Sequence, residues 1–241
     1  MKPSVVTFID RCFRDTADHD YIADRTCYRY RLDQQFLWAS LQAIEKYLKA
    51  ILLYNKINTS DLNHSVKKAY ERVLAIPDID FDFTEEVTKF IEYIDDKGEN
   101  RYFEFPFYLK GDELFMLDRT IWHIRRYCYY MKTTIKDQNG TEIDLFPHEI
   151  KKAQKDYYFS NPHKYYIIGG LLESILKDKK NPARKSLVWK NPCFCQRKRK
   201  TIKDFPARFS AGNPTHIHHP EVIQELKNYV KFSNKFKKVF M

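Results

Sequence analysis

Glycine is scarce in this sequence, with only 6 residues in 241, and the chain contains no glycine-rich loop. Loops that cradle phosphates or dinucleotides depend on glycine, because a side chain would keep the backbone away from the ligand. The scarcity therefore argues against P-loop enzymes and dinucleotide folds. The Ser-His-Asp order of serine hydrolases and the H-E-x-x-H motif of zinc proteases are also absent.

Long apolar runs and an even set of cysteines are missing as well. No run approaches the roughly 20 apolar residues that cross a bilayer, and charged residues interrupt any signal-peptide core at the N-terminus. The 5 cysteines, an odd number, do not make a disulfide framework. We therefore expect no membrane span, no cofactor and a reducing cytoplasmic location.

The positive charge of the chain is concentrated at its end. The formal net charge is +10, and residues 184–241 contain 14 Lys or Arg against 3 Asp or Glu. The first 183 residues, with 28 basic and 29 acidic side chains, are close to neutral. A basic segment attracts polyanions, with nucleic acid as the first candidate and a membrane surface as the second. A solvated tail without a partner is the alternative.

Hydrophobic periodicity predicts helices over the first two thirds of the chain. The clearest runs from about Leu32 to Tyr54, and shorter helices begin after Asp61 and at Thr84. Apolar residues that recur every three or four positions form their core faces. The residues predicted to be buried are Leu37, Leu41, Ile44, Leu48, Ile51, Leu52, Val66, Ala69, Tyr70, Val73, Leu74, Val87, Phe90, Ile91 and Ile94.

A second long helix is predicted from Asp112 to about Thr134. Its core face comprises Leu114, Leu117, Ile121, Ile124, Cys128 and Met131. The opposite face collects Phe115, Arg119, Trp122, His123, Arg126 and Tyr130. Guanidinium groups bind phosphate, aromatic rings stack on bases and an imidazole moves protons near neutral pH, so this face suits RNA. Packing against another helix or a second subunit, with Arg119 paired to a carboxylate, is the alternative.

Two units follow from this pattern. Residues 1–140 are predicted to form an all-α, up-and-down helical bundle, with weaker helices at 5–14 and 21–30 and a long aromatic loop at 98–111. Residues 141–241 contain 7 prolines and are expected to form an irregular, partly helical basic extension. Helices are expected there near 169–178 and from Pro220 onward.

The run QFLWASLQAIEKYLKAILLYN, followed by LNHSVKKAYERV, resembles the HEPN domain family over roughly residues 20–135. The residues that carry the resemblance are Glu45, Lys46, Leu48, Lys49, Ala50, His64 and Val66. The resemblance implies a compact helical bundle that commonly dimerises. Many members are metal-independent ribonucleases of toxin or defence type. Others are inactive and bind nucleotides or partners, often beside a nucleotidyltransferase.

The ribonuclease motif of that family is an arginine, usually a polar residue, and a histidine after four to six intervening positions in a late helix. The resemblance points to Arg119 and His123, with three intervening residues, and to Arg126 as catalytic residues. A homodimer through, or beside, the Phe115, Trp122 and Tyr130 face would bring two such pairs to one cleft. Arg14 and His19 have four intervening residues, but they lie at the wrong end of the fold, and we treat that match as coincidental.

In addition to Trp122, the extension supplies further candidates for nucleic-acid contact. They are Arg184, Trp189, Arg197, Lys198, Arg199 and Lys200. Zinc-ligand residue types also occur there, at Cys193, Cys195, His216, His218 and His219. Their spacing is poor for zinc, and we predict no metal site. Two functions stay open: a metal-independent endoribonuclease, or a silent module that binds RNA, a nucleotide or a protein such as a nucleotidyltransferase.

Overall fold

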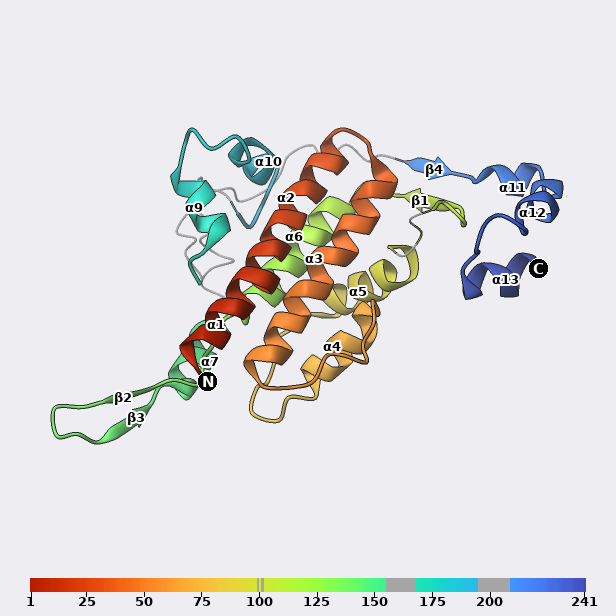
Figure 1. The fold of residues 1–241 in the computed structure, drawn as a ribbon. Helices are drawn as coiled ribbons and strands as arrows, with labels where there is room; N and C mark the ends of the chain where they lie inside the picture. Colours follow the sequence, from red (N-terminus) through yellow and green to blue (C-terminus); the bar gives the residue numbers. More distant parts are fainter. Residues whose placement is uncertain (99, 101, 155–167, 195–208) are drawn as a thin grey trace.

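The computed structural model describes residues 1–98, 100, 102–154, 168–194 and 209–241, and the described chain is mostly helical (Figure 1). The predicted all-α class is confirmed at this level. Two short antiparallel ladders, which the sequence did not predict, supplement the helices. In the described part of the chain, no helix is both long enough and apolar enough to cross a bilayer.

The chain begins with one continuous helical rod, where the sequence predicted one or two weaker helices over residues 5–14 and 21–30. It comprises α1 (Pro3–Ile9), the π-helical segment η1 (Asp10–Asp15) and α2 (Thr16–Arg29). Backbone angles stay helical through both junctions, so the wider π turn does not break the rod. The side chains of Ile9, Ala17, Tyr21 and Tyr28 are buried along it.

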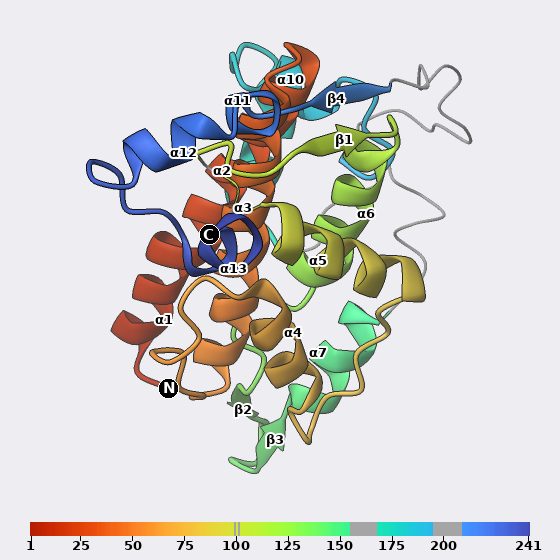
Figure 2. The same ribbon diagram turned by 90° about the vertical axis from the view of Figure 1, so that its right-hand side faces the viewer.

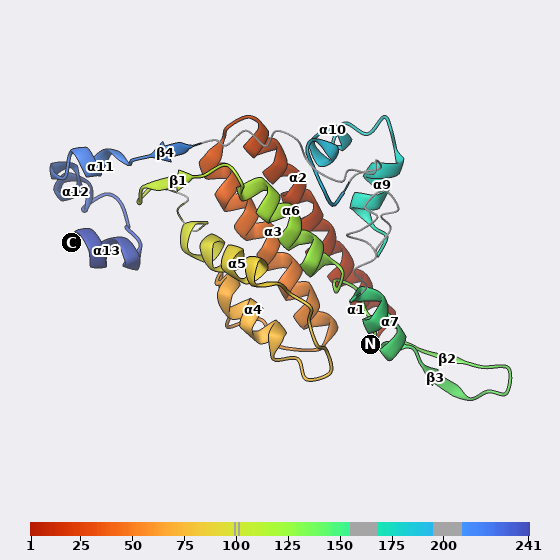
Figure 3. The same ribbon diagram turned by 180° about the vertical axis from the view of Figure 1, so that it is seen from behind.

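The central helix, α3 (Asp33–Tyr54), contacts α2, α4, α5 and α6. It returns beside α2 after a short turn, so the two helices are antiparallel (Figures 1 and 3). Its predicted core residues are confirmed: each has at most 2% of its surface exposed, and most have none. The helix ends where Lys56 adopts a positive φ of 59°.

Two shorter helices, α4 (Val66–Leu74) and α5 (Glu85–Lys97), pack on α3. The Ser65 hydroxyl caps α4 by accepting from the backbone N–H of Lys68 at 3.3 Å. The residues predicted to be buried in these helices are buried, except Leu74, which is 46% exposed. Leu74 is the last residue of α4, where the chain already turns away from the core.

Helix α6 (Glu113–Arg125) lies between α2 and α5, as the view from behind shows (Figure 3). The prediction that it continues to about Thr134 is wrong. After Arg126 the backbone N–H groups of Tyr127 and Cys128 bond three residues back, at 3.0 Å each, and tighten the last turn. Cys128 and Met131 are buried as predicted, but as part of an irregular segment.

The strands form two separate ladders. β1 (Phe107–Leu109), within the segment predicted to be a loop, pairs antiparallel with β4 (Ser210–Gly212). β2 (Thr134–Lys136) and β3 (Glu142–Asp144) form a hairpin that projects from the body of the molecule (Figures 1 and 3). The β-branched run before Lys136 favours a strand over a helix, which accounts for β2 where the sequence predicted the end of a long helix.

The region after the hairpin contains six short helices among the described residues. They are α7 (Phe146–Ala153), α9 (Leu171–Lys177), α10 (Arg184–Val188), α11 (Thr215–His218), α12 (Glu221–Leu226) and α13 (Asn234–Phe240). α9 and α10 lie against α2, and Leu172, Leu176 and Leu187 join the same hydrophobic core as the bundle. Residues 209–241, the C-terminal module, lie at the end of the molecule opposite α9 (Figures 1 and 3), with α13 near α5 (Figure 2).

A buried ionic clasp joins α9 to the bundle. The Arg125 guanidinium donates to Asp18 of α2 at 2.8 and 2.9 Å and to Glu173 of α9 at 2.7 and 2.8 Å. All three side chains are at most 2% exposed. Burial opposes the charge on Arg125, but the two carboxylates outweigh it and raise its pKa well above the ordinary value.

Candidate functional site

The predicted catalytic face of α6 is covered in the structure. Trp122 and His123 are 1% and 5% exposed, and Arg126 is fully buried. The Arg126 guanidinium carbon lies 4.0 Å from the centre of the Trp122 ring, and its Nη2 lies 3.0 Å from Nδ1 of His123. In the described chain this face packs against neighbouring segments, and its role in RNA binding stays a prediction.

Ionic partners from distant segments explain this burial. Arg126 donates to both carboxylate oxygens of Asp82, at 2.9 and 3.1 Å, and to the Ala153 carbonyl at 2.7 Å. Tyr127 donates to the same Asp82 at 2.6 Å. Arg119 Nη2 lies 3.7 Å from Glu86, a carboxylate pair of the kind the packing interpretation requires. These contacts hold the α4–α5 connection and the end of α7 against α6, and both segments cover its predicted catalytic face.

His123 is poorly suited to proton transfer in this position. Burial, and then the charge of Arg126, lower its pKa from 6.5 to about 4. The imidazole is therefore neutral at pH 7. A general base must also reach the proton that it removes, and a side chain that is 5% exposed cannot meet a macromolecular substrate without movement of its cover.

The predicted dimer face is also engaged within the chain. Trp122 is buried, and the Tyr130 hydroxyl accepts from the N-terminal ammonium group at 2.9 Å. Phe115 is partly buried. These three residues therefore do not form the exposed aromatic patch on which the predicted interface depended.

The predicted nucleic-acid contacts of the extension lie partly outside the described residues. Arg197, Lys198, Arg199 and Lys200 are outside them, and the predicted strip stays a prediction. Arg184 and Trp189 hold the extension together: Arg184 Nε donates to the Leu176 carbonyl at 3.2 Å. The Trp189 ring lies 5.7 Å from the Arg29 guanidinium carbon, and its carbonyl accepts from Arg25.

The zinc-ligand types are dispersed as far as they are described. Cys193 is buried near α10, whereas His216 contacts the rings of Phe236 and Phe240 in the C-terminal module. Cys195 lies outside the described residues. Among residues that the structure places, no three His, Cys, Asp or Glu side chains are grouped as a metal site would require.

A polar cleft instead opens beside the π-helical segment. Its volume is about 640 Å³, and it lies between the N-terminal rod and α9. The rod contributes Thr7, Asp10, Arg11, Arg14, Asp15 and His19, and α9 with its preceding residue contributes Gly170, Leu171 and Ser174. We call it the Arg14 cleft. π turns inside α-helices occur frequently at functional sites, because they displace side chains from the regular helical face.

Arginines and carboxylates alternate in the Arg14 cleft. Arg14 lies 2.9 Å from Asp10 and 3.2 Å from Asp15, and Arg11 lies 3.2 Å from Asp15. Burial opposes the charge on Arg14, but the neighbouring carboxylates of Asp10 and Asp15 favour it, and its pKa is raised above the ordinary value. Arg14 is therefore a permanently charged group fixed in place.

The hydroxyl of Tyr54 anchors this arrangement from α3. It donates to Asp10, and its pKa is raised, first by burial and then by that hydrogen bond. The hydroxyl therefore stays protonated and keeps Asp10 oriented toward Arg14.

The opposite wall of the cleft requires a glycine. Gly170 has a φ of 101°, which residues with a side chain rarely adopt. A Cβ atom there would lie 3.6 Å from both Arg14 Nε and Arg125 Nη2, so the backbone of Gly170 lies close to both guanidinium groups. Because Arg125 also binds Glu173, the ionic clasp fixes this wall against the rod.

His19 and Arg11 stand at the open side of the cleft. Both residues are exposed, and the Arg11 side chain is 78% exposed, whereas that of Arg14 is 12% exposed. An accessible imidazole beside two guanidinium groups can bind a phosphate and move a proton. The spacing of Arg14 and His19, which we treated as coincidental, was the sequence signal for this group.

Comparisons with known proteins give no match. No protein-family model, no curated protein and no solved structure matches this chain. Its function is therefore argued from the residues and their geometry.

Proposed function

We propose that this chain is an RNA-directed, HEPN-like protein that cleaves RNA without a metal ion, with its reactive groups in the Arg14 cleft. One observation carries the proposal: Arg11, Arg14 and His19 line a single open cleft, whereas His123 is buried. Arg14 and His19 also have four intervening residues, with the polar Asp15 after Arg14, but they precede the stretch that resembles the HEPN family and do not lie in a late helix, so the proposal rests on the cleft and not on the motif.

The chemistry would be transesterification within the RNA strand. His19 removes the proton of a ribose 2′-OH, and the 2′-oxygen attacks the adjacent phosphorus. The bond from phosphorus to the 5′-oxygen breaks, and that oxygen takes a proton from an imidazolium or from water. A cyclic phosphate and a free 5′-OH result. Arg11 and Arg14 stabilise the negative charge that develops on the phosphate.

Dimerisation would supply a second imidazole to the same phosphate. Val5 and Phe8 of α1 are 42% and 58% exposed and lie one helical turn apart, close to the Arg14 cleft in sequence. A homodimer that covers them would bring two clefts near each other. A toxin or defence role in the cytoplasm fits such an enzyme.

A second candidate is a silent binding module. It is favoured by the pairing of both arginines with Asp10 and Asp15, because a phosphate must compete with those carboxylates. In that case the protein holds RNA, a nucleotide or a partner such as a nucleotidyltransferase and does not cleave.

Cleavage of labelled single-stranded RNA in EDTA tests the proposal. We expect His19→Ala to reduce cleavage by about 10²-fold or more, because a general base contributes roughly that factor. His148→Ala is the matched control, since His148 is an exposed histidine, with 74% of its side chain accessible, on α7. We expect His148→Ala to cleave like the wild type.

The outcomes separate the alternatives. Unchanged cleavage by His19→Ala would remove the Arg14 cleft as the reactive site, and loss of cleavage in a correctly folded His123→Gln would return the site to α6. RNA binding without any cleavage by the wild type would favour the silent module. No RNA binding at low salt would defeat the RNA-directed function.

A further inference from the structure

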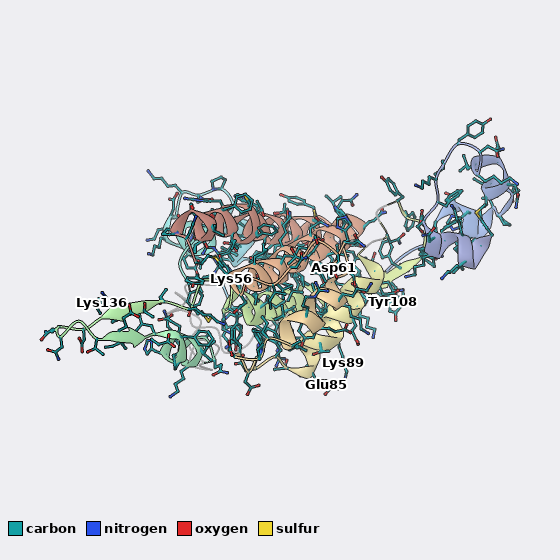
Figure 4. The ribbon with its side chains drawn as sticks, turned by 60° about the horizontal axis from the view of Figure 1, so that its bottom comes forward. Lys56, Asp61, Glu85, Lys89, Tyr108 and Lys136 are labelled. Atoms are coloured by element: carbon teal, nitrogen blue, oxygen red, sulfur yellow. The ribbon has the colours of Figure 1, made fainter. Side chains whose placement is uncertain are left out.

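The C-terminal module is fastened to one edge of the bundle by several kinds of contact. β4 pairs with β1, and Lys235 Nζ lies 2.6 Å from Asp96 at the end of α5. Ser233 donates its backbone N–H and its hydroxyl to Glu104. Tyr108, labelled in Figure 4, lies on β1 at this junction. The module therefore has a defined position against the bundle.

Three hollows adjoin one another at the module. One has a volume of about 570 Å³, and the others have about 410 and 400 Å³. Lys231 and Phe232 line all three, so the hollows meet at these two residues. We call the three hollows together the aromatic groove, because rings contribute much of their wall.

Two large rings stand open along this groove. Tyr102 is 80% exposed and Tyr229 is 83% exposed. Behind them the rings of Phe232 and Phe236 stack, with centroids 4.4 Å apart and planes 12° apart. Rings that present their faces to solvent on a fixed aromatic base are suited to stacking with planar ligands.

The loop that carries Tyr102 is held in an unusual shape. Phe103, the next residue, has a φ of 55°, which side chains other than glycine and asparagine rarely adopt. The Asn100 side chain brackets the loop by binding the backbone of Phe105 in both directions, at 2.6 and 3.0 Å. Strained backbone that the surroundings hold in place is typical of ligand-binding segments.

Lysines provide the charge of the groove. Lys227, Lys231 and Lys237 line its hollows, and Glu104 is the one acidic residue among the described residues that line them. Glu104 already accepts two hydrogen bonds from Ser233. Lysine is a compact point charge that suits phosphate oxygens. The groove thus combines open rings with cations at intervals.

We infer that the aromatic groove binds single-stranded RNA, with bases stacked on Tyr102 and Tyr229 and phosphates at Lys227, Lys231 and Lys237. The choice of RNA rests on the proposed function. The combination itself is that of single-strand binding proteins, in which rings receive bases and a cationic groove follows the backbone. The C-terminal module, which contributes most of the groove, lies at the opposite end of the molecule from α1 and α9, whose segments line the Arg14 cleft (Figures 1 and 3), so the groove would hold the strand away from the reactive groups.

Fluorescence anisotropy with a labelled uridine strand of about ten nucleotides tests this inference on the full-length chain. We expect Tyr102→Ala and Tyr229→Ala each to weaken binding by about tenfold, since each substitution removes a ring on which one base stacks. Lys231→Ala should reduce the salt slope of binding by about 0.7. Tyr30→Ala, which removes a 67% exposed ring directly after α2, and Lys89→Ala on α5 are the matched controls and should bind like the wild type.

Each outcome bears on one proposal at a time. Wild-type affinity in the Tyr102→Ala/Tyr229→Ala double variant would overturn the groove inference, even if His19→Ala abolishes cleavage. Equal affinity for duplex and single strand, or displacement of the strand by an apolar or acidic peptide, would also overturn it. No binding of any RNA at low salt would defeat the proposed function itself.

Discussion

At the scale of single residues, the environment of a side chain decided its role more than its type did. His19 and His123 are both histidines next to arginines in the sequence pattern. His19 is exposed at a cleft, whereas His123 lies under a cover held by Asp82. The sequence could supply both candidates, but not the choice, because Asp82 lies 41 positions before His123 along the chain.

The buried His123 predicts a loss of stability in weak acid. Its pKa in the folded chain is about 4 against 6.5 in the unfolded chain, so only the unfolded chain takes a proton between these values. The effect of His123 on the free energy of unfolding is absent above pH 6.5 and becomes destabilising as the pH falls toward 4. By pH 5 the expected loss in the free energy of unfolding is about 2 kcal/mol.

Urea denaturation at pH 7 and pH 5 measures this effect. His123→Gln keeps an oxygen that can accept from Arg126 but does not titrate, so its stability should fall less between the two pH values. Parallel changes in the wild type and His123→Gln would show that His123 is not the group responsible.

At the scale of helices and strands, elements with a regular hydrophobic period could be predicted from the sequence. Elements that interrupt this period could not. α3 repeats its apolar stripe for six turns, and its bounds and core follow from that stripe. The predicted end of α6 was wrong because the apolar spacing continues through Cys128 and Met131 after the helix has stopped. The Arg14 cleft was missed because a π turn shifts the helical phase, which no regular period describes.

The contact between α3 and the end of α5 leads to a prediction at this scale. A Cβ atom at Gly98 would lie 2.6 Å from Leu41 Cβ and 2.7 Å from the Ile94 carbonyl oxygen. We expect Gly98→Ala to lower the free energy of unfolding by about 1–3 kcal/mol, because the two helices must separate to admit a methyl group.

Chemical denaturation of a double-mutant cycle checks this prediction. Leu41→Gly removes the Cβ atom that the new methyl group would meet, so the two substitutions should not add. Lys97→Ala, beside Gly98 on the surface of α5, is the control and should change stability by less than about 0.5 kcal/mol. Additive effects of Gly98→Ala and Leu41→Gly would argue that the helices do not make this close approach.

At the scale of the whole molecule, the ionic clasp joins parts that the sequence separated at residue 140. Arg125 of the bundle binds Glu173 of α9, and apolar side chains of α9 and α10 enter the core of the bundle. The prolines and the difference in net charge between the two parts indicated an extension. They give no information about which carboxylate Arg125 binds, because Glu173 lies 48 positions away in the sequence.

Loss of the clasp should destabilise both parts together. Arg125→Met leaves Asp18 and Glu173 buried without their cation, and we expect the free energy of unfolding to fall by about 3–5 kcal/mol. Tryptophan fluorescence and circular dichroism should report one shared transition. Lys89→Met, which breaks the exposed pair with Glu85 seen in Figure 4, is the control and should leave the midpoint nearly unchanged. Separate transitions for the two signals would contradict joint folding of the bundle and α9.

The π turn between α1 and α2 makes the Arg14 cleft sensitive to insertions and deletions. One residue in an α-helix corresponds to a rotation of about 100°. Deleting a single residue of the segment 10–15 would therefore restore an ordinary helix and turn everything upstream of it around the axis, Thr7 and Arg11 included. Related sequences could carry different side chains at many positions of this rod and keep the cleft. A rod that is one residue shorter or longer would lose the cleft.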